Sequence, residues 1–293
     1  MVVQKKTFSF YLITTILCWS ATPAIAKLAL AEMDNFQLLF YTTIVGFFSL
    51  FLLNLFLGKL RLLKAFTFRD YLTMSGIGFI GIFLYHIFFF GSFMFAPAGQ
   101  ANVLNYLWPV FVIIFAILVL KEKYNYKTIL AVILSLFGAA IVISGNNPFV
   151  FDNQYIKGYL LASIGAICYG FFSVLGKKYL YDKYLSMLIY FFSAAVIIIP
   201  VSLMVSGFVI PKSIVTLTAI MILGGLMNSI IFVFWFKALS LGHTHQIANL
   251  IYAVPFLAMI WTYFLNDEQL AESSLIGLGL IVTGIIVQYK NQV

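Results

Sequence analysis

Charged residues are scarce in this chain of 293 residues, where Asp, Glu, Lys and Arg together make up only 9% of the sequence. A soluble domain usually carries about 25%. Hydrophobic residues make up 63%, and the mean hydropathy is +1.06. This composition excludes an ordinary soluble domain, and we expect an all-α integral membrane protein.

Long stretches lack charge altogether. Tyr71–Leu120 contains no Asp, Glu, Lys or Arg, although one membrane-spanning helix needs only about 20 apolar residues. It must therefore hold two spans, with a turn near residues 96–99. Transmembrane strands would alternate polar and apolar residues, and these runs do not. The apolar runs predict ten transmembrane helices with approximate cores at 8–28, 36–57, 71–94, 99–120, 128–145, 158–176, 185–206, 214–236, 246–265 and 273–289.

The sequence repeats itself. Gln100–Glu122 returns 146 residues later as Gln246–Glu268, with a proline and a terminal glutamate at matching positions. Earlier positions repeat with an offset of 150: Cys18 and Cys168, Lys27 and Lys177. Such self-similarity indicates an internal duplication. We expect two repeats of five spans each, residues 1–150 and 151–293.

The distribution of basic residues predicts the orientation. Placing the N-terminus in the cytoplasm puts every Lys and Arg except Lys27, Lys157 and Lys212 on the inner side, as the positive-inside rule favours. An odd number of spans in each half then inverts the second half relative to the first. We expect a multi-pass protein of the cytoplasmic (inner) membrane with both termini in the cytoplasm. Inverted repeats are typical of secondary transporters that work by alternating access.

Signals for other functions are missing. No Walker motif is present, which disfavours an ATPase. Facing His, Asp or Glu ligands are lacking, which disfavours a membrane-embedded enzyme. No Asp or Glu lies in the middle of a span, so the usual carboxylate proton relay is missing. The net charge of +8 suits an anionic leaflet and requires no nucleic acid. We therefore expect no cofactor or metal, with a small-molecule substrate and the lipid bilayer as partners. The sequence leaves monomer and weak dimer open.

Three features together carry a family resemblance. Trp19-Ser20-Ala21-Thr22-Pro23 leads to Lys27 in the first span, and the fourth and ninth spans each hold a mid-helix proline and end in Glu. In these features the whole chain resembles the EamA type of the drug/metabolite transporter (DMT) superfamily. Asn105–Pro109, followed by Leu120-Lys121-Glu122, is most similar to the bacterial exporters of aromatic and other amino acids.

The resemblance implies a secondary transporter of small organic metabolites, above all an exporter of amino acids. Uptake of another metabolite, such as a nucleotide-like or S-adenosyl compound, remains an alternative, and so does a passive channel.

Candidate cargo-binding residues lie on the third, fourth, sixth and ninth spans. His86 is the only ionisable side chain well inside a span, and the resemblance places a third-span histidine at the central cavity. Amides, aromatics and a proline share one face of the fourth span, and the ninth span repeats this arrangement. We expect substrate binding by His86, Tyr85, Asn102, Asn105, Trp108, Tyr169, Asn249 and Tyr252, and gating or structural roles for Pro109, Pro255, Glu122 and Glu268. Interhelical hydrogen bonding is the alternative for His86 and the amides.

Overall fold

The computed structural model describes residues 2–92, 94–96, 101, 104–123, 126–144, 153–242, 247, 250–266 and 273–289. Within these ranges all regular structure is helical, and no strand occurs. Six helices are long and apolar enough to cross a membrane: Thr7–Ala29, Asn35–Phe56, Phe68–Phe89, Asn153–Lys178, Lys183–Val205 and Ile214–Leu241. Shorter apolar helices cover Trp108–Leu120, Ile129–Gly138 and Phe256–Leu265. The expected turn at 97–99 and most of the connection between the repeats lie outside the described residues.

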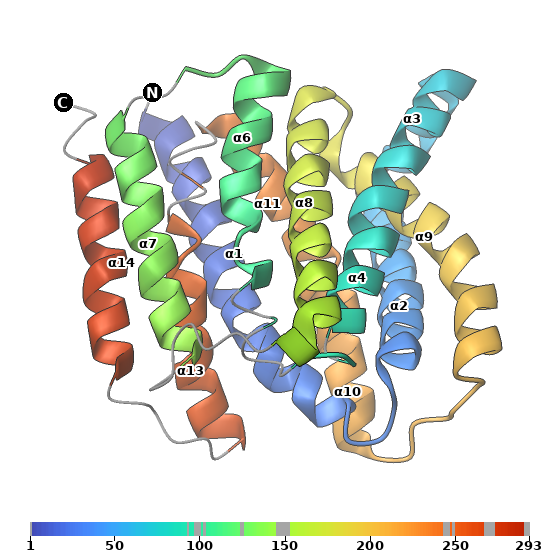
Figure 1. Ribbon diagram of the computed structural model, residues 1–293. Coiled ribbons are helices and arrows are strands. Elements are labelled where there is room, and N and C mark those ends of the chain that lie inside the picture. The colour runs from blue at the N-terminus through green and yellow to red at the C-terminus, as the bar shows by residue number, and fades with distance from the viewer. Residues whose placement is uncertain are drawn as a thin grey trace.

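The helices form one bundle in which they run roughly side by side (Figure 1). Helices α1 and α14 bring the start and the end of the described chain to the same end of this bundle. In order, the elements are α1 (Val2–Ala29), α2 (Asn35–Phe56), η1 (Lys59–Ala65), α3 (Phe68–Gly78), η2 (Phe79–Leu84), α4 (Tyr85–Ser92), α6 (Trp108–Leu120), α7 (Tyr126–Ser144), η3 (Asn153–Tyr155), α8 (Ile156–Lys178), α9 (Lys183–Val205), α10 (Ile214–Ile222), η4 (Leu223–Met227), α11 (Ile230–Leu241), α13 (Ala253–Asn266) and α14 (Ser273–Tyr289).

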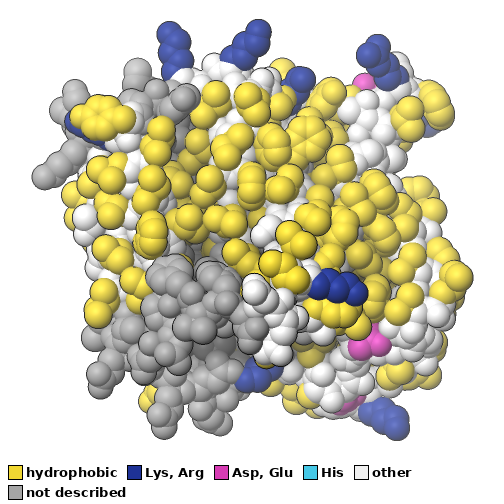
Figure 2. Space-filling view, in the orientation of Figure 1, with side chains coloured by type: hydrophobic (Ala, Val, Ile, Leu, Met, Phe, Trp, Pro, Cys, Tyr) yellow, Lys and Arg dark blue, Asp and Glu magenta, His cyan; other side chains and the backbone are white. Residues whose placement is uncertain are grey.

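The outer surface of the bundle is apolar. Figure 2 shows hydrophobic side chains over most of one face, with Lys and Arg mainly toward its two ends. Large side chains such as Phe56, Leu118 and Met204 are 83%, 68% and 87% exposed. A soluble monomer rarely exposes so continuous an apolar surface. The helices therefore present the surface expected of a protein surrounded by lipid.

The third span of each half is a continuous helical rod made of three elements, and each rod contains a π-helical segment at a matching place. Segment η2 joins α3 to α4 and follows Gly78, whereas η4 joins α10 to α11 and includes Gly224, which lies 146 residues later. At both glycines another backbone lies very close: a Cβ on Gly78 would be 2.5 Å from Cα of Tyr190 on α9, and one on Gly224 would be 2.7 Å from the carbonyl oxygen of Thr42 on α2. Each π-helical rod thus packs tightly against a helix of the other half.

Helix packing joins the two halves throughout. Helix α2 packs against α9 and α7 against α14, α1 packs against both α11 and α13, and α8 packs against both α4 and α6. Exchanging the two halves turns the contact of α1 with α11 into that of α8 with α4, and the contact of α1 with α13 into that of α8 with α6. The contacts of α2 with α9 and of α7 with α14 join equivalent spans and stay the same. The centre of the bundle is consequently built from the first, third and fourth helical rods of both halves.

The connection that follows the first helix of each half also contacts the other half. Glu32 accepts hydrogen bonds from the backbone N–H groups of Lys212 (2.9 Å) and Ser213 (3.1 Å) at the start of α10. The hydrogen bond from Lys212 is the largest influence that lowers the pKa of Glu32. Asp182, 150 residues after Glu32, forms an ion pair with Lys59 of η1. An acid in each half therefore binds the segment that leads into the third rod of the other.

Candidate functional site

Six aromatic side chains from both halves meet at the centre of the bundle. Trp19 lies at the hub, with ring centroids 5.2 Å from Phe232 and 5.4 Å from Trp235. Trp108 and Tyr169 stack edge to face at 4.8 Å, a geometry that aromatic pairs prefer. We refer to this set as the aromatic cluster: Trp19, Tyr85, Trp108, Tyr169, Phe232 and Trp235. It brings together three of the predicted site residues, Tyr85, Trp108 and Tyr169.

Hydrogen bonds hold two of the indoles in place. Nε1 of Trp19 donates to the carbonyl of Met227 at 3.3 Å, at the end of η4. Nε1 of Trp235 donates to Oγ of Ser173 on α8 at 3.2 Å. A π-helical turn interrupts the regular α-helical hydrogen-bonding pattern and often marks a functional site. In this protein the carbonyl of Met227, the last residue of η4, accepts the hydrogen bond from Trp19 of α1. This hydrogen bond links α1 to the third span of the second half, which consists of α10, η4 and α11.

Three buried polar atoms of the predicted site residues lack a hydrogen bond of normal geometry to the described part of the chain. Oδ1 of Asn105 and the hydroxyls of Tyr169 and Tyr252 make no hydrogen bond within the part of the chain that the structure describes. These residues are only 4%, 3% and 0% exposed. More than about 90% of buried polar groups in native proteins are hydrogen-bonded, so each exception calls for an explanation. Tyr252 is the clearest case, because Ser173 lies near the hydroxyl of Tyr169 and Tyr85 lies near the amide of Asn105. A polar group of a bound molecule would satisfy the hydroxyl of Tyr252.

The fourth helical rod of each half is interrupted at matching positions. Residues 106 and 107 form a turn before α6, and residues 251 and 252 form a turn before α13. Pro109 consequently lies in the first turn of α6 and Pro255 is the third residue of α13. The sequence prediction of a mid-helix position is wrong for both prolines. A proline lacks the amide hydrogen that an interior turn needs, and its fixed φ suits the start of a helix.

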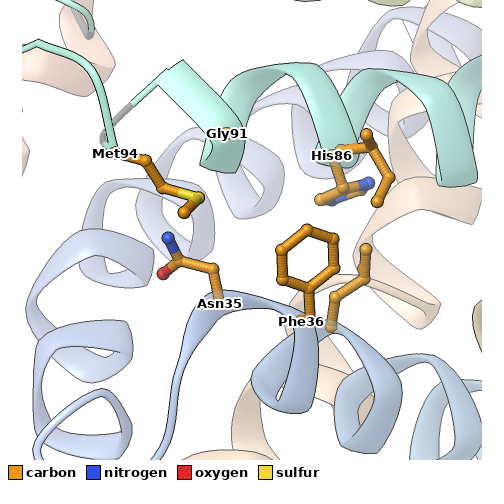
Figure 3. A pocket seen from close by; sticks show the side chains of 7 residues that line it. Asn35, Phe36, His86, Gly91 and Met94 are labelled. Atoms are coloured by element: carbon orange, nitrogen blue, oxygen red, sulfur yellow. The ribbon is translucent and has the colours of Figure 1, made fainter. Parts of the chain in front are cut away.

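His86 lies beside the aromatic cluster and also faces α2. Its ring is 4.7 Å from that of Tyr85, and Nδ1 hydrogen-bonds to the carbonyl of Ile82 at 2.7 Å. The side chain lines a small, partly open pocket between the start of α2 and α4, opposite Asn35 and Phe36 (Figure 3). His86 is therefore 7% exposed and sits between this pocket and the cluster.

An ion pair connects the halves at one end of the central helices. Oε1 of Glu122, after the end of α6, lies 2.8 Å from Nζ of Lys177 at the end of α8. The same ammonium donates to the carbonyl of Gly242 after α11 at 2.9 Å. The sequence predicts a gating or structural role for Glu122 but names no partner for it. Both residues belong to repeat-related pairs, Glu122 with Glu268 and Lys27 with Lys177, but this relation does not indicate that Glu122 pairs with Lys177.

Some predicted residues lie outside the described part of the chain: Asn102, Asn249 and Glu268.

Phe232 is a member of the aromatic cluster that the sequence does not single out, because 18% of the chain is aromatic and no pattern distinguishes this residue. Among the residues searched, no group of three or more His, Cys, Asp or Glu side chains could hold a metal ion.

Comparisons with known proteins agree with the helical architecture. The model of the EamA-like transporter family matches residues 7–144 and again residues 156–289. A solved crystal structure superposes with a TM-score of 0.84 over 96% of this chain and 97% of that chain, at 22% sequence identity. At this identity the superposition shows the fold alone.

Two kinds of named relatives are found. A protein of Archaeoglobus fulgidus, named as an uncharacterized transporter, is 26% identical over 95% of this chain and 96% of its own length. The aromatic amino acid exporter YddG of Ancylobacter novellus is 28% identical over 36% of this chain and 37% of its own length. The Escherichia coli protein of the same name is 32% identical over 28% of this chain and 30% of its own.

Proposed function

The chain belongs to the EamA-like transporter family of the DMT superfamily, and on this premise we propose that it is a secondary carrier that exports amino acids by alternating access. One observation carries the proposal. At the centre of the bundle, where helices of both halves meet, aromatic rings adjoin buried polar atoms that make no hydrogen bond to the described residues. Rings suit the apolar part of an amino acid, whereas hydroxyl and amide groups suit its carboxylate and ammonium.

For the architecture, we propose ten membrane crossings in two inverted repeats, residues 1–150 and 151–293, with both termini in the cytoplasm. Helical segments overlap all ten predicted spans within the described ranges, and the family model matches once in each half. Helix α1 descends in Figure 1 whereas α8, its counterpart, ascends. The correspondence of helix contacts when the two halves are exchanged also supports a two-fold symmetry between them.

The proposed cargo site is lined by Tyr85, His86, Asn105, Trp108, Tyr169 and Tyr252, together with Asn102 and Asn249 from the predicted faces of the fourth and ninth spans. Carriers with inverted repeats commonly bind their cargo near the bilayer midplane, at interrupted helices. The turns before α6 and α13 are such interruptions, and Tyr252 lies within one of them. An interrupted helix leaves backbone groups at the turn without their usual partners inside the helix, and these groups are available to a ligand.

Gating is assigned to the ends of the fourth and ninth spans. Pro109 and Pro255 favour the interruption in each rod, so that the two parts of the rod are able to move separately. The ion pair of Glu122 with Lys177 closes one end of the central helices, and repeat symmetry assigns the same role at the other end to Glu268. Opening toward the side of Lys177 then requires this ion pair to break.

Amino acids are proposed as cargo because YddG, named as an aromatic amino acid exporter, is among the relatives. A competition screen on the purified protein tests this assignment, since a ligand that binds only the folded state raises the melting temperature. We expect stabilisation by one or more amino acids and none by nucleotides or S-adenosyl compounds. The reverse result would contradict an amino-acid carrier.

A further inference from the structure

A lysine near one end of α11 is held by two tyrosines. Nζ of Lys237 donates to the hydroxyl of Tyr184 at 2.8 Å and to that of Tyr11 at 3.2 Å. The same ammonium lies 4.1 Å from the ring centroid of Tyr184 and 5.0 Å from that of Tyr11. Tyr11 comes from α1 and Tyr184 from α9, so the cation sits where three helices meet.

A second lysine approaches the same ring. Nζ of Lys59 lies 4.7 Å from the ring centroid of Tyr184 and forms an ion pair with Asp182. We call Tyr11, Lys59, Tyr184 and Lys237 the lysine–tyrosine cluster. Asp182 offsets the charge of Lys59 alone, and no carboxylate among the described residues pairs with Lys237. The cluster therefore carries one uncompensated positive charge.

The charge of Lys237 lies in a partly buried position. Both neighbours in sequence, Phe236 and Ala238, are 1% and 0% exposed, and Lys237 itself is only partly exposed. The tyrosine rings and hydroxyls that surround the ammonium stabilise it but are neutral, so its net charge remains. An ammonium also has three donors, and the two hydroxyls use two of them. One donor and one charge remain for an anionic ligand.

An apolar surface begins next to this cation. Phe10, Ile13 and Leu17 are 56%, 56% and 50% exposed, and their spacing of three and four residues places them along one face of α1. The ring of Phe234, on α11 with Lys237, lies 5.8 Å from Phe10 and 5.1 Å from Tyr11. A molecule bound at Lys237 would thus have an exposed apolar helix face beside it.

We propose that the lysine–tyrosine cluster binds the phosphate headgroup of an anionic phospholipid, whose acyl chain lies along the exposed face of α1. Basic sites between transmembrane helices recognise such headgroups on the cytoplasmic side of membranes. The cluster lies at the end of the bundle that also holds Lys177, because Lys177 contacts Gly242 directly after α11. The positive-inside pattern assigns this end to the cytoplasmic leaflet. The site is separate from the proposed cargo site.

The test compares two lipids on purified protein in neutral detergent. Phosphatidylglycerol and phosphatidylcholine with identical acyl chains are titrated, and both the melting temperature and lipid retention in native mass spectrometry are recorded. We expect phosphatidylglycerol to bind more tightly. Lys237→Gln should reduce this preference by about fivefold, the contribution typical of one lysine near an anionic surface. Lys237→Arg keeps the charge and should retain the preference.

Lys178→Gln is the matched control. Lys178 is exposed at the same end of the bundle and contacts one tyrosine ring, that of Tyr179, at 6.0 Å. Its replacement should leave the lipid preference intact. The proposal is overturned if Lys237→Gln retains the preference, if Lys178→Gln loses as much, or if Lys237→Arg loses it despite normal folding. Inorganic phosphate that stabilises the protein as much as the lipid would overturn the lipid as ligand. None of these measurements depends on transport.

Discussion

In the proposed cargo site, individual hydroxyl groups would connect folding to cargo binding. The side chain of Tyr252 is fully buried, and its hydroxyl has no hydrogen-bond partner within the described chain. A buried polar group in this state costs roughly 1–3 kcal/mol. A cargo molecule that hydrogen-bonds to the hydroxyl removes that cost, so the free energy reappears as binding affinity.

Replacement of Tyr252 by Phe tests this connection. The variant loses only the hydroxyl, so its melting temperature should stay equal or rise, whereas cargo affinity should fall by about fivefold, the worth of a hydrogen bond of roughly 1 kcal/mol. Tyr71→Phe is the matched control, because the hydroxyl of Tyr71 donates to the carbonyl of Leu63 at 2.8 Å. It should lower the melting temperature and leave affinity unchanged. Unchanged affinity in Tyr252→Phe would place the hydroxyl outside the cargo site.

His86→Ala separates the two roles open to this histidine. The ring adjoins Tyr85 of the aromatic cluster and also hydrogen-bonds to Ile82. If His86 binds cargo, the substitution should reduce affinity by about fivefold or more, with a smaller effect on folding. Affinity and melting temperature are measured on the same sample. A lowered melting temperature with unchanged affinity would identify a structural histidine, and the site would then centre on Asn105, Trp108 and Tyr252.

At the scale of helices, the third rod of each half depends on close contact with the other half. A Cβ on Gly78 would lie 2.5 Å from the Cα atom of Tyr190, whereas nothing lies within 4 Å of one on Gly76, two residues earlier in α3. Gly78→Ala should therefore destabilise the protein by about 1–3 kcal/mol through overpacking. Gly76→Ala should be neutral or stabilising by up to about 1 kcal/mol. Unfolding in detergent measures both, and equal stabilities would contradict the contact between α3 and α9.

Helix positions could be predicted from the sequence because uncharged runs and their polar boundaries determine where a chain enters and leaves lipid. The predicted spans at 36–57 and 185–206 correspond closely to α2 (Asn35–Phe56) and α9 (Lys183–Val205). The π-helical segments η2 and η4 could not be predicted, since they depend on contacts with other helices. The sequence predicts Pro109 inside a helix and therefore does not reveal the turn before α6.

Only part of the candidate site could be predicted from the sequence. Tyr169 stands 150 residues after Trp19, at the offset that relates the earlier parts of the two halves, and the two rings lie 6.2 Å apart. Phe232 carried no such signal. The ion pair of Glu122 with Lys177 joins residues far apart in sequence, so that only the fold reveals which partners meet.

At the scale of the whole molecule, the proposed inverted repeat fixes which loops face which side. We expect a cysteine introduced at position 152, in the connection between the halves, to react with a membrane-impermeant maleimide on intact cells. A cysteine at position 62, in the exposed segment η1, should be spared. Both are made in a background without Cys18 and Cys168, and permeabilised cells provide the labelling control. The opposite pattern would show that the proposed orientation is wrong.

The central claim is that the protein is a carrier with one central site open to one side at a time. Counterflow in proteoliposomes tests it most directly, with the amino acid that gives the largest thermal stabilisation. Vesicles preloaded with the unlabelled amino acid should take up the radiolabelled form rapidly and accumulate it transiently, whereas empty vesicles should show no overshoot. Equal uptake by loaded and empty vesicles, without transient accumulation, would indicate a passive channel and contradict alternating access.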